Sequence, residues 1–304
     1  MGETTKRVIS SAILVPLLVF CIHYAGWYYL QLYALGVVLV ILGLTEFYRF
    51  ADKGDDGKPF VKSGMVFGIF IFTVYYFQLL GAQKQLPVPP EILSAIKYFQ
   101  NPNAYVIPMF LILFIWSFIL QILTRPLEGA IHSVSTTIVG VVYLSVTMGH
   151  FLVIMAYDYG IFYIWLVAGL TFITDGGAYF GGRWFGRHPA GLKISPKKTW
   201  EGYITGIITA TIYTIGLKLT WEHFSQTELP FSIAELLIFT PVFSLISVVG
   251  DLAESAMKRD AKIKDSSSVI PGHGGVLDLV DAVIITLPCS YFYLSAKASL
   301  GFVV

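Results

Sequence analysis

The sequence is poor in charged residues and contains very little cysteine. Only 13% of its 304 residues are Asp, Glu, Lys or Arg, whereas a soluble domain usually carries about 25%. The two cysteines, Cys21 and Cys289, lie far apart in apolar runs and form no Cys-x-x-Cys pair. This spacing argues against a zinc site and against a disulfide framework. The shortage of charge excludes an ordinary soluble domain.

Long apolar runs take the place of the missing charge. Hydrophobic residues make up 56% of the chain, and the mean hydropathy is +0.71. A helix that crosses a membrane needs about 20 mostly apolar residues. Nine runs are candidates: 8–24, 28–48, 64–81, 104–123, 134–156, 160–182, 200–219, 233–256 and 278–297. We therefore expect an all-α polytopic integral membrane protein with about nine transmembrane helices.

The first apolar run and the segment 82–103 each have an unusual feature. The first apolar run follows Lys6 and Arg7, as it would in a signal peptide, but no convincing cleavage site precedes Trp27. We therefore predict a retained first span. The segment 82–103 contains the stretches LPVPPE and QNPN, and its proline and asparagine content predicts an irregular external loop.

The distribution of basic residues predicts the orientation. With the N-terminus in the cytoplasm, sixteen of the 20 Lys and Arg residues lie in inner segments and four in outer segments. Cytoplasmic loops are rich in Lys and Arg, so nine spans place the C-terminus outside. Residues 1–160 then form an N-terminal region of about five spans. Residues 161–304 form a catalytic region of about four spans, with cytoplasmic loops at 183–199 and 257–277.

A polar stripe follows the apolar stretch LISVVG in the eighth predicted span. On a helix, one face carries Asp251, Glu254, Ser255 and Lys258. An ionisable residue at mid-membrane depth costs about 2.5–3.5 kcal/mol on insertion scales. Such a stripe normally faces a bundle interior or a wet cavity, although ordinary interfacial charges at a helix end are the alternative.

The stretch PGHGGVLDLVD opens the last predicted span. Asp278 and Asp281 are three residues apart and share a helix face. Carboxylate oxygens suit hard cations, and Mg²⁺ usually takes one or two of them together with substrate phosphates. Gly274 and Gly275 allow the backbone to approach a ligand closely. The alternative is an acidic residue that only stabilises a helix N-terminus.

Two further stretches supply cations and one more acidic position, Asp175. KISPKKTWEG contains Lys193, Lys197 and Lys198, which suit phosphates or lie as snorkelling lysines at an interface. Ser195 or Thr199 is expected to cap the next helix. In DGGAYFGGRWFG, Asp175 is either a site residue or a buried packing group, and its glycines predict close helix packing. Together these residues favour phosphoryl or nucleotidyl transfer to a lipid head group.

The motifs resemble those of the phosphatidate cytidylyltransferase (CDP-diacylglycerol synthase) family. The likeness is concentrated in residues 171–281. It rests on Ser255-x-x-Lys258-Arg259, then Lys264-Asp265, then Pro271-x-His273-Gly274-Gly275-x-x-Asp278-x-x-Asp281. KISPKKTWEG and DGGAYFGGRWFG also resemble family stretches, in the same order. One position departs from the family pattern, because Leu279 stands where the family usually has arginine.

The resemblance implies a reaction of CTP with phosphatidate that gives CDP-diacylglycerol and pyrophosphate. It implies Mg²⁺ as cofactor, and a second cation such as K⁺ is left open. The implied metal ligands are Asp251, Asp278 and Asp281, with Asp175 and Glu254 as weaker candidates. The implied catalytic residues are Ser255, Lys258, Arg259, Lys264, Asp265 and His273. The implied substrate-binding residues are Lys193, Ser195, Lys197, Lys198, Thr199, Gly274 and Gly275.

The expected setting is the bacterial cytoplasmic (inner) membrane, with membrane lipid and the two substrates as partners and no nucleic acid. Similar proteins are dimers, so the resemblance implies a homodimer. A related lipid nucleotidyltransferase or lipid kinase with another acceptor is one alternative, which Leu279 keeps open. An ion-coupled secondary transporter is another, with Asp175, Asp251 and Asp278 as ion sites. The sequence shows no paired halves of the kind common in transporters.

Overall fold

The computed structural model describes residues 3–82, 88–99 and 102–301. Across these ranges the regular structure is helical and contains no β-strand. The elements divide into two compact units. The first contains Met1–Ala156 and Ala261–Leu279, and the second contains Tyr157–Asp260 and Val280–Val304. The division into residues 1–160 and a catalytic region 161–304 is a functional one, and it stays a prediction.

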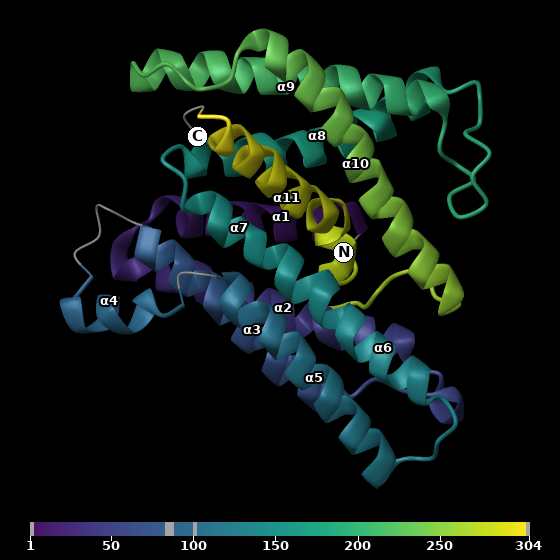
Figure 1. The fold of residues 1–304 in the computed structure, drawn as a ribbon. Helices are drawn as coiled ribbons and strands as arrows, with labels where there is room; N and C mark the ends of the chain where they lie inside the picture. Colours follow the sequence, from purple (N-terminus) through teal and green to yellow (C-terminus); the bar gives the residue numbers. More distant parts are fainter. Residues whose placement is uncertain (1–2, 83–87, 100–101, 302–304) are drawn as a thin grey trace. The chain divides into compact units, whose positions relative to one another are not determined.

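The first unit is built from the N-terminal helices (Figure 1). They are α1 (Glu3–His23), η1 (Gly26–Tyr29), α2 (Leu30–Ala51), η2 (Gly54–Asp56), α3 (Val61–Ala82), α4 (Pro90–Lys97), α5 (Pro102–Thr124), α6 (Ala130–Val141), η3 (Val142–Val146) and α7 (Thr147–Met155). Helix α3 packs against α2, α5 and α7. The fully buried Tyr48 of α2 donates a hydrogen bond to the carbonyl of Thr137 in α6 at 2.9 Å. This contact fixes the end of α2.

The second unit contains α8 (Gly160–Phe185), α9 (Trp200–Ser225), α10 (Ile233–Asp260) and most of α11 (Val276–Ser299). Helices α8 and α9 pack most closely, as the glycines of DGGAYFGGRWFG predict. A Cβ added at Gly177 would lie 3.0 Å from the Cα of Gly206, and one at Gly206 would lie 2.6 Å from the carbonyl of Thr174. Small residues at these positions therefore allow the two backbones to approach.

Hydrogen bonds between hydroxyls join the helices of this unit. Thr174 of α8 contacts Ser244 of α10 at 2.9 Å, and Thr214 of α9 contacts Thr240 of α10 at 2.8 Å. All four side chains are fully buried. In a membrane such pairs satisfy polar groups that lipid cannot satisfy. They fix α10, which carries the polar stripe, against α8 and α9.

The prediction of an all-α polytopic membrane protein is confirmed. Each of the nine predicted spans coincides with helix, and seven helices of the described chain are long and apolar enough to cross a membrane. The other two spans are α1, whose apolar part 8–23 is shorter, and α9, which falls outside this set. The count of nine and the orientation stay predictions.

The prediction of an irregular segment at 82–103 is wrong for residues 90–97. This stretch forms α4, with Pro90 at the first helical position. Proline is favoured there because its missing N–H would have no partner in a helix anyway and its φ is already helical. The parts of the segment at 83–87 and 100–101 lie outside the described residues.

Candidate functional site

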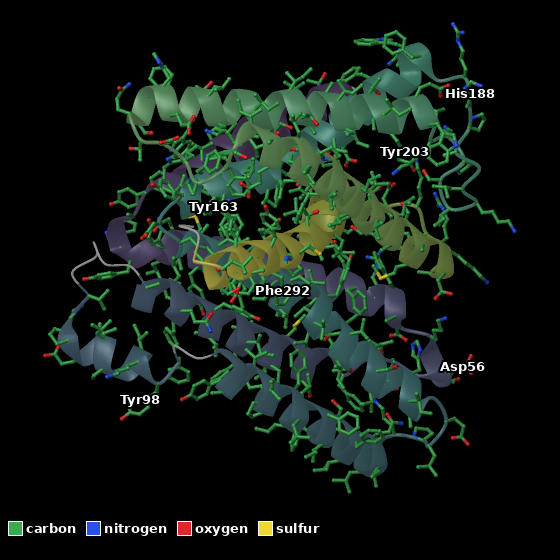
Figure 2. The ribbon with its side chains drawn as sticks, turned by 45° about the horizontal axis from the view of Figure 1, so that its top comes forward. Asp56, Tyr98, Tyr163, His188, Tyr203 and Phe292 are labelled. Carbon is green, nitrogen blue, oxygen red and sulfur yellow. The ribbon has the colours of Figure 1, made fainter. Side chains whose placement is uncertain are left out.

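The loop between α8 and α9 is closed on itself, and this closure positions Lys198. The backbone N–H of Ala190 donates to the Lys198 carbonyl at 2.8 Å, and that of Trp200 donates to the His188 carbonyl at 3.0 Å. His188 Nδ1 also lies 2.5 Å from a carboxylate oxygen of Glu201. Figure 2 labels His188 on this loop and Tyr203 on the first turn of α9. Both ends of the loop are therefore held next to α9.

The start of α9 follows the sequence prediction. Thr199 is its N-cap residue, and the Thr199 hydroxyl accepts from the Gly202 N–H at 3.2 Å. A threonine in this position satisfies one of the N–H groups that a helix start leaves without a partner. Thr199 therefore has a capping role in this structure, and its predicted substrate contact stays a prediction.

Lys198 lies among the carboxylates of the second unit. Its ammonium forms an ion pair with Asp251 of α10 and interacts electrostatically with Asp175 of α8 and Asp281 of α11. The Lys198 Nζ also lies 5.9 Å from the ring centroid of Tyr203, within the range of cation–π attraction. Burial lowers the pKa of Lys198, and the carboxylates of Asp175 and Asp281 oppose part of that shift.

The polar stripe of α10 lies next to Asp281, because α10 and α11 are in close contact near Gly250. A Cβ added at Gly250 would lie 2.7 Å from the Asp281 carbonyl. Glu254, which is fully buried, forms an ion pair with Lys258 one turn later. Both of these side chains interact electrostatically with Asp281. The second unit thus brings together a charged cluster that contains four carboxylates and two ammonium groups. Its members are Asp175, Lys198, Asp251, Glu254, Lys258 and Asp281.

The turn before α11 belongs to the first unit, together with Asp278. Asp278 Oδ2 accepts from the Gly275 N–H at 2.8 Å, from the Ser266 N–H at 2.8 Å and from the Ser266 hydroxyl at 2.6 Å. The contact with Gly275, three residues earlier, is that of a helix capping box. Asp278 therefore stabilises the N-terminus of α11, which was the alternative role. Its metal role stays a prediction.

The glycines of the turn leave room for the protein's own side chains. Gly274 has φ +97°, a conformation that favours glycine, and its Ile270–Gly274 backbone pair closes the turn. A Cβ added at Gly275 would lie 1.9 Å from Ser266 Oγ and 2.5 Å from both carboxylate oxygens of Glu46. The close approach predicted for a ligand is thus made by Ser266 and Glu46 in this structure.

Substitution of Gly275 tests this packing. Gly275→Ala is expected to destabilise the protein by about 1–3 kcal/mol, as overpacking of a filled site does, because Ser266 and Glu46 must move away from the new methyl group. The thermal midpoint of the purified protein in detergent measures this. Gly216→Ala in α9 is the control, because nothing lies within 4 Å of a Cβ there. Equal midpoints for both variants would contradict the packing argument.

Glu46 and Ser266 were missed by sequence reasoning. Glu46 lies in α2 and is only 5% exposed, and Ser266 is fully buried. One signal existed, since an ionisable residue in an apolar run is costly unless it has partners. The partners themselves are 220 and more residues away in the sequence, so spacing alone could not reveal them.

The remaining predicted residues differ in their exposure. The exposed ones are Lys193, Lys197, Arg259, Lys264 and Asp265, and the half-buried ones are Ser195, Ser255 and His273. His273 Nε2 lies 3.3 Å from the Ser11 hydroxyl of α1. His273 Nδ1 is buried and has no hydrogen-bond partner within the described chain. Within the described residues, the hydrogen bond of the His273 ring is therefore made through Nε2.

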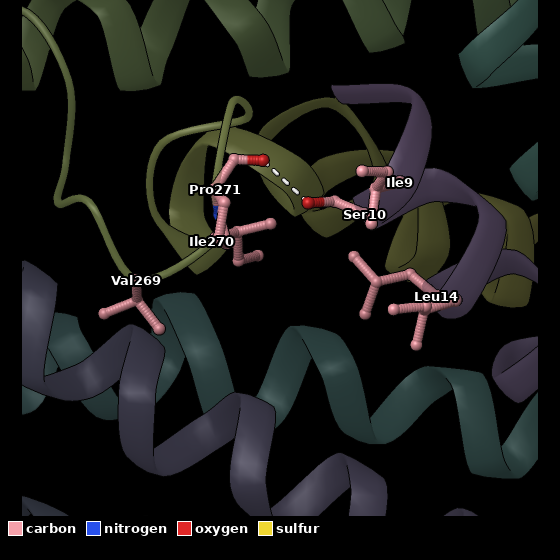
Figure 3. A pocket seen from close by; sticks show the side chains of 7 residues that line it. Ile9, Ser10, Leu14, Val269, Ile270 and Pro271 are labelled. Carbon is pink, nitrogen blue, oxygen red and sulfur yellow. Dashed lines mark hydrogen bonds between the residues drawn. The ribbon is translucent and has the colours of Figure 1, made fainter. Parts of the chain in front are cut away.

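A largely apolar pocket of about 500 Å³ lies beside the turn in the first unit (Figure 3). It is lined by Ile9, Ser10, Ile13 and Leu14 of α1 and by Val269, Ile270 and Pro271. The Ser10 hydroxyl donates to the Pro271 carbonyl at 2.7 Å and joins the two walls. Its volume is within the usual range of small-molecule pockets, and its lining suits an apolar group.

The donor set of the second unit fits a hard divalent cation. No group of three or more His, Cys, Asp and Glu side chains in residues 3–82, 88–99 and 102–301 is arranged to hold a metal by itself. Mg²⁺ does not need such a group, since it is usually bound by one or two carboxylates plus substrate phosphates. Asp251 and Asp281 supply two carboxylates, and Lys198 neutralises them in this structure.

Comparison with known proteins identifies the family. The profile of the "Cytidylyltransferase family" matches residues 91–296. Three relatives are each named phosphatidate cytidylyltransferase. The one from Haemophilus influenzae is 34% identical over 95% of this chain and 98% of its own length. Those from Thermotoga maritima and Synechocystis are each 28% identical, over 96% and 95% of this chain and 96% of their own lengths. The chain therefore belongs to the cytidylyltransferase family and is a nucleotidyltransferase enzyme with several membrane-spanning helices.

Proposed function

We propose that the protein is a phosphatidate cytidylyltransferase that works at the cytoplasmic face of a bacterial inner membrane, as a homodimer. It would convert CTP and phosphatidate into CDP-diacylglycerol and pyrophosphate. The observation that carries this proposal is the charged cluster around Lys198, in a chain whose full-length relatives bear that name. The apolar pocket beside the turn supports a lipid substrate.

In the proposed reaction a phosphate oxygen of phosphatidate attacks the α-phosphorus of CTP. The bond from that phosphorus to the oxygen bridging the β-phosphate breaks, and pyrophosphate leaves. The attacking phosphate is anionic near neutral pH, so no strong general base is needed. The protein's part is alignment and charge neutralisation, which supply most of the catalysis in such transfers.

The charged side chains take separate roles in this scheme. Lys198 and Lys258, each now paired with a carboxylate, would bind phosphate oxygens as point charges. Arg259 and Lys264 would neutralise the triphosphate or the phosphatidate head group. Asp251 and Asp281 would hold Mg²⁺. Asp278 belongs to the other unit, and its metal role stays a prediction from the sequence. The cation, when bound, neutralises charge that develops on the phosphates.

The four nucleotides distinguish this function from its alternatives. With purified protein, phosphatidate and Mg²⁺, pyrophosphate is expected with CTP and not with ATP, GTP or UTP. EDTA should stop the release, and added Mg²⁺ should restore it. A label in the α-phosphate of CTP should move to the lipid, whereas a label in the γ-phosphate should not. Transfer of the γ-label would instead identify a lipid kinase and would overturn the proposal.

A further inference from the structure

Glu46 is a buried carboxylate that accepts hydrogen bonds on both of its oxygens. Oε1 accepts from the Ser267 hydroxyl at 2.6 Å and from the Val276 N–H at 3.0 Å. Oε2 accepts from the Ser266 hydroxyl at 3.0 Å and from the Leu277 N–H at 2.9 Å. An ionised carboxylate has no proton to donate, so its hydrogen bonds are all accepted ones. Burial of a charged group is tolerated when such bonds compensate for the lost contact with water. The four hydrogen bonds therefore hold the Glu46 side chain in one position.

The two N–H groups come from the first turn of α11. A helix N-terminus is a ready site for an anion, because its N–H groups lack intrahelical partners and the dipole favours negative charge. Here the anion is the protein's own Glu46. The N–H groups of Val276 and Leu277 therefore serve a structural purpose in this structure.

Ser266 links Glu46 to Asp278. The Ser266 hydroxyl lies 3.0 Å from Glu46 Oε2 and 2.6 Å from Asp278 Oδ2. A hydroxyl has one proton to donate, so the two carboxylates share it. The Ser266 N–H and the Gly275 N–H complete the contacts of the same Asp278 oxygen. A change at Glu46 would therefore alter how Asp278 is held.

We propose that Glu46 is a positioning residue for the reaction. It ties α2 to the segment 266–277 and fixes the orientation of Asp278, a predicted metal ligand, and so we expect it to set the Mg²⁺ requirement of the reaction. This inference rests on the proposed function for its kinetic part. Its structural part, that Glu46 orders the segment, stands independently of that function.

Glu46→Gln tests both parts, because it keeps the side-chain volume and turns an acceptor into an NH₂ group that faces donors. We expect the Mg²⁺ concentration for half-maximal rate to rise about tenfold or more, with a smaller change in kcat. We also expect trypsin to cleave several-fold faster after Lys262 and Lys264, two exposed residues just before the segment. Ser266→Ala added to Glu46→Gln should cause little further change, because the two residues act through one network.

Glu235→Gln is the matched control. Glu235 is a partly buried carboxylate of the second unit, bonded to Tyr293 at 2.5 Å and to Lys297 at 2.6 Å, and it lies outside the proposed machinery. Its variant should leave both readouts unchanged. If Glu46→Gln does not fold, Ser267→Ala, which removes one of the four donors, should shift both readouts in the same direction by a smaller amount.

The outcomes separate the two proposals. Faster cleavage with an unchanged Mg²⁺ requirement and unchanged KM for CTP would reduce Glu46 to a structural residue and overturn the inference. Unchanged cleavage would overturn it as well. If the wild-type protein releases no pyrophosphate from CTP, the proposed function fails, and the cleavage rates alone then decide whether Glu46 orders the segment.

Discussion

Asp281→Asn is expected to reduce CTP-dependent pyrophosphate release by on the order of 10²–10³-fold, the usual cost of losing one electrostatic group from an active site. Asp281 lies where α10 and α11 meet and interacts with Asp175, Glu254 and Lys258. Asparagine keeps the size of the side chain and an oxygen that can accept from the Ala282 N–H, as Asp281 does at 2.6 Å. The fold should therefore survive while the charge is lost.

The measurement is the initial rate at saturating CTP and phosphatidate, over a range of Mg²⁺ concentrations. The thermal midpoint of each variant reports folding. Glu228→Gln provides the control, because Glu228 is exposed in the loop between α9 and α10 and has no assigned role. A wild-type rate for Asp281→Asn at every Mg²⁺ concentration would remove Asp281 from the site.

A further substitution distinguishes a metal ligand from a simple counter-charge. Thiolates prefer softer metals than carboxylates do, so Asp281→Cys should be inactive with Mg²⁺ and should regain part of its activity with Cd²⁺. A counter-charge role predicts no such recovery. The wild-type protein, which carries Cys21 and Cys289, shows in parallel whether Cd²⁺ acts elsewhere.

The sequence predicted the helices well for a physical reason. Backbone N–H and C=O groups of a segment that crosses lipid must form hydrogen bonds within that segment. A long apolar run is therefore expected to form a helix. The same logic predicted the face of α10, because helical periodicity alone places Asp251, Glu254 and Lys258 together. The Thr199 cap followed from local chemistry, since the hydroxyl and the N–H it accepts from are three residues apart.

The features that the sequence did not reveal depend on contacts between distant segments. Glu46 contacts Ser267 across 221 positions and Leu277 across 231, and no periodicity encodes such a pairing. The glycines of the PGHGG turn predict a close approach, but a small residue does not show which group approaches. Which group approaches is settled by packing. At Gly275 it is Ser266 and Glu46, and at Gly274 it is Asp278.

Lys198→Met should have a large effect for a different reason, since it removes a cation that interacts with carboxylates of three helices. Lys198 pairs with Asp251 and interacts with Asp175 and Asp281. Methionine keeps an unbranched stem of similar length and loses the charge. Charged hydrogen bonds contribute about 1.5–3 kcal/mol, which corresponds to roughly a 10- to 100-fold fall in rate. Lys198→Arg keeps the charge and should retain more activity than Lys198→Met.

Lys198→Met should lower the rate but raise the affinity for a divalent cation. In this structure the ammonium of Lys198 supplies positive charge next to Asp251, so we expect a divalent cation to compete with it for this carboxylate. Without substrates, Lys198→Met should therefore bind Mn²⁺, measured by calorimetry, more tightly than the wild-type protein. Lys197→Met is the neighbouring comparison, because Lys197 is exposed and should change Mn²⁺ affinity little. If the two variants bind Mn²⁺ alike and lose activity alike, Lys198 is one more surface lysine, and the charged cluster does not work as a unit.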